Sequence, residues 1–277
     1  MNGFSLREKV QTIPCFMNRI SAWNPHENTA CNRRYRIGVM LLGIVLAALL
    51  IRIYAFEAKP YLQRDEFFYL EAGEAWSTGG MSAMYVDGDV IPPFFPMLTQ
   101  ATAKFLGCSI WTGAATVNIG MGTLMVLSMF GLGTVLGSSR IGLIMALLTA
   151  VHPELVEYSA AFLREASALA LFSGFLLFYA LALNRFAWSS LAAGAAIMLA
   201  VICRPEYIEA LFYTFLFEIV YWFFTRKNGG GSGAFMRCVC CLAGFVVTGI
   251  IVSLILNASW HFWPDFVFRR FLTRVWM

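Results

Sequence analysis

Charged residues are scarce in this chain. Only 13% of its 277 residues are Asp, Glu, Lys or Arg, roughly half the share of an ordinary soluble domain, whereas 59% are hydrophobic and the mean hydropathy is +0.69. Such a composition predicts a membrane protein that crosses the bilayer several times. The apolar runs are continuous and do not alternate with polar residues, which favours spanning helices over a barrel.

The sequence also shows no large net charge, no metal-binding cysteine spacing, no signal-peptide pattern in its first residues and no apparent internal repeat. The net charge of +4 is small and spread over polar segments, so it bears on topology and not on a nucleic-acid partner. The cysteines show no metal-binding spacing, and three of them, Cys238, Cys240 and Cys241, lie in an apolar run as small hydrophobic residues do. Residues 1–36 lack the apolar core of a signal peptide, so we expect the first span to direct insertion. No internal repeat is apparent, which disfavours a transporter built from duplicated halves.

The apolar runs predict an all-α polytopic membrane protein with about seven transmembrane helices. The polar tail 1–36 ends in a basic cluster, which the positive-inside rule places in the cytoplasm. The membrane module is expected over residues 37–257, and residues 258–277 are expected to form an external amphipathic tail. The expected spans are 37–54, 110–136, a third from 141 to about 151, 166–183, 188–203, 207–224 and 238–257.

Residues 55–109 are expected to form one long external loop. The first half carries acidic residues among aromatic ones, a pattern that suits a helix lying in the interface: Asp65, Glu66, Glu71 and Glu74. Three prolines, the last of them Pro96, exclude a helix interior until after that residue. The stretch that follows, up to Leu106, is too short to cross the bilayer. The loop is therefore predicted to hold two interfacial helices.

Three charged clusters from distant parts of the chain are expected on the same outer face: Arg64-Asp65-Glu66, Arg164-Glu165 and Arg204-Pro205-Glu206. A carboxylate can accept a proton from an acceptor hydroxyl or amine, while a guanidinium can neutralise a phosphate leaving group. Group transfer from a lipid phosphate needs both. The alternative is that each pair is a structural ion pair or an interfacial anchor. The adjoining acid Glu66 favours function for Asp65, whereas both interpretations stay open for the other two clusters.

The motif Arg64-Asp65-Glu66-Phe67-Phe68-Tyr69 resembles the acidic motif in the first external loop of the GT-C superfamily of membrane glycosyltransferases. It is most similar to glycosyltransferase family 39 and its bacterial relatives, the protein mannosyltransferase and aminoarabinose transferase type. Further stretches agree in order across about residues 37–224. They are Pro92-Pro93-Phe94-Phe95-Pro96, His152-Pro153 through Tyr158-Ser159, Arg164-Glu165 and Arg204-Pro205-Glu206.

The resemblance implies inverting transfer of a sugar from a polyprenyl-phosphate donor to a protein, lipid or glycan acceptor on the non-cytoplasmic face. It implies that Asp65 is the catalytic base and that Glu165 is the second acidic residue, where many relatives carry Asp. Glu66 and Glu165 are expected to orient the acceptor, support Asp65 or hold a metal. Some branches use a divalent metal and others do not, so the cofactor is left open. The expected ligands of the donor phosphate are Arg64, Arg164 and Arg204.

Two alternatives accompany this hypothesis. Family members typically continue for several more spans, so the chain could be a non-catalytic or partial subunit that works with a larger membrane partner. It could also be a transporter or binder of an anionic lipid, whose path should carry ionisable residues near the bilayer midplane. Glu218 is the residue nearest to that description. The short loops favour a bacterial inner membrane, with the site facing outside.

Overall fold

The structure is a computed structural model of the chain. The expected external tail 258–277 and residues 1–24 of the expected cytoplasmic tail lie outside the described residues. The chain divides into two compact units, Met1–Val39, of which residues 25–39 are described and helical, and Met40–Met277. The described residues are 25–59, 61–79, 85–86, 89–90, 92–184, 187–225 and 231–256.

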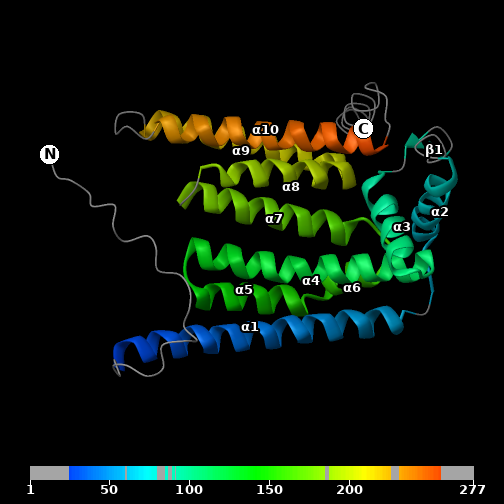
Figure 1. The fold of residues 1–277 in the computed structure, drawn as a ribbon, viewed down its shortest axis with the longest axis horizontal. Coiled ribbons are helices and arrows are strands. Elements are labelled where there is room, and N and C mark those ends of the chain that lie inside the picture. The colour runs from blue at the N-terminus through cyan, green and yellow to red at the C-terminus, as the bar shows by residue number, and fades with distance from the viewer. Residues whose placement is uncertain are drawn as a thin grey trace. The chain divides into compact units, whose positions relative to one another are not determined.

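Helices make up nearly all of the described residues (Figure 1). Two strands of two residues, β1 (Tyr85–Val86) and β2 (Asp89–Val90), pair antiparallel. The helices are α1 (Pro25–Glu57), α2 (Arg64–Gly79), α3 (Phe94–Leu106), α4 (Ile110–Leu136), α5 (Ser139–Val151), α6 (Pro153–Ala160), α7 (Glu165–Asn184), α8 (Ser189–Cys203), the 3-10 turn η2 (Pro205–Tyr207), α9 (Ile208–Thr225) and α10 (Gly231–Leu256).

Five helical segments are long and apolar enough to cross a membrane: Asn32–Glu57, Ile110–Leu136, Glu165–Asn184, Pro205–Phe224 and Gly233–Leu256. Helices α5 and α6, which meet at a bend of 56°, would make a sixth if they form one span. Helix α8 has 15 residues, about 22 Å at 1.5 Å per residue, and falls short of a hydrocarbon core of about 30 Å. The helical, polytopic character of the chain is confirmed, whereas the count of seven spans stays a prediction.

Helix α1 begins earlier than the apolar pattern indicates. It starts at Pro25, inside the expected polar tail, although its apolar part begins only at Asn32. Proline is well suited to a first helical turn, and no glycine or further proline follows before Gly38. The first turns of α1, before Asn32, are therefore helical although their hydropathy excludes them from the span.

Within the second unit, helices α5, α4, α7, α8 and α10 lie side by side, and α2 and α3 pack across one end of them (Figure 1). We call this the α2 end. Close approach of α8 and α10 depends on two glycines, since a Cβ on Gly194 would overlap the Cys241 carbonyl and one on Gly244 would overlap the Leu191 carbonyl. Because the helices alternate in direction, the α6–α7 and α8–α9 connections both lie at the α2 end.

Helices α2 and α3 occupy the segment expected to be the first external loop, and they pack on each other and on α4. The predicted start of the second loop helix was wrong: α3 begins at Phe94 and contains Pro96 in its first turn. Proline is tolerated there because the first N–H groups of a helix have no intrahelical partner. The helix ends at Gly107, whose φ of 63° lies in the left-handed region. An interfacial position for the two helices stays a prediction.

The break between α5 and α6 is stabilised by a buried arginine. Pro153 lacks the N–H that the Thr149 carbonyl would accept in a continuous helix. Arg52 of α1, which is fully buried, donates to the Thr149 and Ala150 carbonyls, both at 3.3 Å, and to Ser159 Oγ of α6 at 3.2 Å. A buried cation is tolerated where backbone carbonyls surround it. Arg52 thereby fixes the direction in which α6 leads toward the α2 end.

Candidate active site

Glu66 is fully buried, and both of its carboxylate oxygens are engaged. Oε1 forms an ion pair with Lys59 and accepts a hydrogen bond from the Phe162 backbone N–H at 3.1 Å. Oε2 accepts one from the Gln63 N–H at 3.0 Å. The side chain thus joins the start of α2 to the end of α1 and to the α6–α7 connection. The described contacts of Glu66 are with the protein itself, and the roles expected for it at the site stay predictions.

The α6–α7 connection, residues 161–164, is also held from α4. The Asn118 amide donates to the Leu163 carbonyl at 3.1 Å and to the Ala161 carbonyl. The Phe162 ring is 3% exposed and packs edge-to-face against Trp111 at 5.5 Å between centroids. This short stretch is therefore fixed by hydrogen bonds and packing, which positions the two charged residues that follow.

These residues, Arg164 and Glu165, meet Arg204 and Glu206 from the α8–α9 connection. We call the four the arginine–glutamate cluster. Arg204 lies 3.6 Å from Glu165 Oε1 and 3.9 Å from Glu206 Oε2, and Arg164 Nε lies 4.0 Å from Glu165 Oε1. All three distances exceed the length of a hydrogen bond. The charges are close enough to compensate one another, but at these distances the ion pairs are not hydrogen-bonded.

Several buried polar atoms of this region have no hydrogen-bond partner among the described residues: Arg164 Nε and Nη1, Glu165 Oε2 and Ser167 Oγ. Native proteins leave few such atoms, because each costs about 1–3 kcal/mol when it stays unsatisfied. The guanidinium can donate to an anionic oxygen and the carboxylate can accept from a hydroxyl. The cluster is therefore suited to a ligand that carries both, as a sugar phosphate does.

Asp65, the expected base, lies at the start of α2. It is exposed in the first turn of α2 and makes no hydrogen bond or ion pair within the described part of the chain. One turn later on the same helix face is Tyr69, whose ring lies 5.9 Å from the Arg164 guanidinium carbon. Tyr69 therefore connects the two: it follows Asp65 by one helical turn and contacts Arg164, whose Nε and Nη1 have no hydrogen-bond partner among the described residues.

Arg64 lies on a different face of α2. Its side chain is exposed, and its guanidinium lies over the Phe68 ring at 5.5 Å. Of its described contacts, none reaches the arginine–glutamate cluster. The structure therefore brings together two of the three expected arginines, Arg164 and Arg204, with Glu165, and places Arg64 at the exposed edge.

Sequence reasoning missed two residues that position the site, Arg52 and Asn118. Each was an available signal, because a strongly polar side chain inside an apolar run of spanning length usually faces the protein interior. The sequence could not indicate their partners, the α5–α6 break and the α6–α7 connection, which lie far away along the chain.

The described residues hold no group of three or more His, Cys, Asp or Glu side chains that could bind a metal ion. The acids of the cluster, Glu165 and Glu206, each face Arg204, which competes with a metal for their oxygens. The possible divalent metal therefore finds no suitable donor set in this part of the chain.

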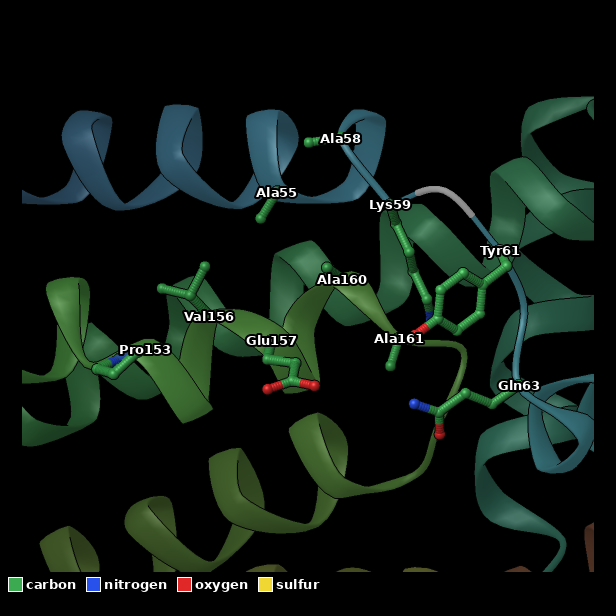
Figure 2. Close-up of a pocket in the computed structure, with 10 residues that line it drawn as sticks. All are labelled: Ala55, Ala58, Lys59, Tyr61, Gln63, Pro153, Val156, Glu157, Ala160 and Ala161. Atoms are coloured by element: carbon green, nitrogen blue, oxygen red, sulfur yellow. The ribbon is translucent and has the colours of Figure 1, made fainter.

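A pocket of about 450 Å³ lies between the end of α1 and α6 (Figure 2). Lys59, Tyr61 and Gln63 line it from the segment that leads into α2. Pro153, Val156, Glu157 and Ala160 line it from α6; Ala55, Ala58 and Ala161 complete it.

No protein-family model matches the sequence, and no curated protein matches it. The resemblance to GT-C glycosyltransferases therefore depends on the charged motifs themselves.

Proposed function

We propose that this chain is a membrane-embedded inverting glycosyltransferase, which moves a sugar from a polyprenyl-phosphate donor to a protein, lipid or glycan acceptor at the extracytoplasmic face. One observation carries the proposal. The guanidinium of Arg164, whose Nε and Nη1 have no hydrogen-bond partner among the described residues, contacts Tyr69, one helical turn after the exposed Asp65 and about a hundred residues away along the chain. A phosphate site next to a free base is the combination that sugar transfer from a lipid phosphate requires.

In the proposed reaction, Asp65 takes the proton from the acceptor hydroxyl as its oxygen attacks the anomeric carbon. The bond between that carbon and the phosphate oxygen breaks, and polyprenyl phosphate leaves with the bonding electron pair. Arg164 and Arg204 stabilise the charge that develops on the phosphate. A single displacement inverts the anomeric centre, and Asp65 then releases the proton to solvent. Glu165 accepts a hydrogen bond from a sugar hydroxyl.

The proposed topology places the α2 end outside the cell, with α8 and the bent α5–α6 pair completing seven spans. Basic residues support this orientation. Arg140 begins α5 at the opposite end, and in the sequence Arg185 falls between α7 and α8 while Arg226 and Lys227 fall between α9 and α10. The positive-inside rule assigns these connections to the cytoplasm. A bacterial inner membrane is the proposed location.

The test is sugar release from a panel of polyprenyl-phosphate sugars by the full-length protein in nanodiscs. Asp65→Asn should lower the rate by about 10²–10⁴-fold, as loss of a general base does. The matched control is Glu74→Gln, an exposed acid on the same helix, which should keep the wild-type rate. Undiminished transfer by Asp65→Asn would reject the assigned base.

The same experiment separates the alternatives. Binding of polyprenyl phosphate without release of any sugar would favour a partial subunit that needs a larger membrane partner, or a lipid binder. A transport path through the spanning helices has less support, because the ionisable side chains buried there have protein partners. Arg52 bonds backbone carbonyls, and Glu218 pairs with Arg237.

A further inference from the structure

The pocket between α1 and α6 has an apolar wall. Four of its lining residues are alanines, Ala55, Ala58, Ala160 and Ala161, and Val156 adds a further apolar side chain. Helix α1 belongs to a spanning segment and α6 to the bent pair that would make another. A pocket of about 450 Å³ between two such helices is open to a hydrocarbon chain that arrives from the bilayer.

The polar part of the pocket favours a cation. The Glu157 carboxylate is exposed and has no ion pair or side-chain hydrogen bond among the described residues. Lys59, the one basic residue of the lining, has its ammonium group paired with Glu66. The remaining net charge of the lining is therefore negative, and the carboxylate of Glu157 carries it.

Two further groups add to this preference. Figure 2 shows the Glu157 carboxylate and the Gln63 amide extending to the same side of the last turn of α6, with Tyr61 also lining the pocket. The amide oxygen of Gln63 can accept a hydrogen bond from an ammonium group, and the Tyr61 ring can attract its charge. A carboxylate, an amide oxygen and an aromatic face together suit an ammonium headgroup.

We propose that this pocket binds a membrane amphiphile with an ammonium headgroup, whose hydrocarbon chain lies between α1 and α6. Such a site is separate from the proposed phosphate site, since none of the residues that line the pocket belongs to the arginine–glutamate cluster. The binding does not depend on sugar transfer, so either proposal can fail alone.

The test is photolabelling of the full-length protein in detergent micelles with two probes of equal chain length, dodecylamine and dodecanol, each with a diazirine in the chain. The amine probe should label residues 55–63 and 153–161 about two- to fivefold more than the alcohol probe, the preference that one partly exposed charge pair confers. Glu157→Gln should abolish this preference. Glu154→Gln, on the same helix and outside the pocket lining, should keep it.

Two arms complete the experiment. Ala58→Trp fills the pocket from an exposed position and should reduce labelling by both probes. Propylamine at equal concentration should not compete, because it lacks the chain that the alanine wall accommodates. Equal labelling by the two probes, or a preference that survives Glu157→Gln, would overturn the ammonium site. Full competition by propylamine would overturn its membrane source.

Discussion

Two ionic clusters lie at opposite ends of the second unit, and they differ in how completely their groups are paired. At the α2 end, the nitrogen–oxygen distances of the arginine–glutamate cluster are 3.6 to 4.0 Å. At the opposite end, Arg237 of α10 donates two hydrogen bonds to the Glu218 carboxylate of α9, both at 2.7 Å, and the Tyr179 hydroxyl of α7 donates a third at 2.7 Å. The first cluster leaves buried atoms of Arg164 and Glu165 without hydrogen-bond partners among the described residues, whereas the second is closed.

The difference separates a structural role from a binding role where residue types alone do not. Both clusters pair arginine with glutamate, so the types of charged residue do not distinguish them. In the closed cluster each charged group is satisfied within the protein, and nothing remains for a ligand. In the open cluster the protein retains unsatisfied groups, a cost that is tolerated where a ligand completes them.

The largest effect on stability is expected at the closed cluster. Glu218→Ala leaves the Arg237 guanidinium buried without its counter-charge, and such a loss costs about 3–5 kcal/mol. Thermal and denaturant unfolding of the purified protein measures the change. The double variant Glu218→Leu with Arg237→Met should recover most of the stability, because it removes both charges. A single variant as stable as the wild type would show that the cluster is not structural.

An intermediate effect is expected at Glu66, which anchors the α6–α7 connection. Glu66→Gln removes the charge opposite Lys59 and should lower the free energy of unfolding by about 1–3 kcal/mol. If Glu66 positions Arg164, the donor KM should also rise for the folded fraction, since the connection that carries Arg164 loses an anchor. Glu74→Gln serves as the control, with a change within about 0.5 kcal/mol. An unchanged KM would limit Glu66 to stability.

The positions of the helices were largely predictable, because hydropathy is a property of each residue in its local window. The runs 110–136 and 166–183 correspond to α4 and α7 nearly residue for residue. The break near Pro153 was predictable for the same reason, since proline acts on its own helix. Helix ends that depend on capping or on polar helical residues were not predictable from hydropathy. Examples are the start of α3 at Phe94 and the start of α1 at Pro25.

The burial of Glu66 and the exposure of Asp65 could not be predicted from the sequence. Adjacent helical residues point about 100° apart, so one of two neighbouring acids can be exposed while the other is buried. Which one is buried depends on the Phe162 N–H, which comes from almost a hundred residues further along the chain. Glu218 presents the same difficulty: its charge suggested a transport path, until Arg237 from the next helix paired with it.

The smallest effect on stability is expected at Arg164, and it is the most informative. Arg164→Gln removes two N–H groups that have no hydrogen-bond partner among the described residues, so the free energy of unfolding should not fall by more than about 0.5 kcal/mol. Polyprenyl phosphate at 100 times its Kd should stabilise the wild type by about 2.7 kcal/mol, and this increment should vanish in the variant.

Arg64→Gln is the matched control for that measurement, because Arg64 is exposed and lies outside the cluster. The Arg64→Gln variant should still be stabilised by polyprenyl phosphate. If Arg64→Gln lost the increment and Arg164→Gln kept it, the phosphate site would lie on the exposed edge of α2. If Arg164→Gln destabilised the protein as much as Glu218→Ala, the open cluster would be structural as well, and the distances of 3.6 to 4.0 Å would then describe a weak ion pair and not a site that awaits its ligand.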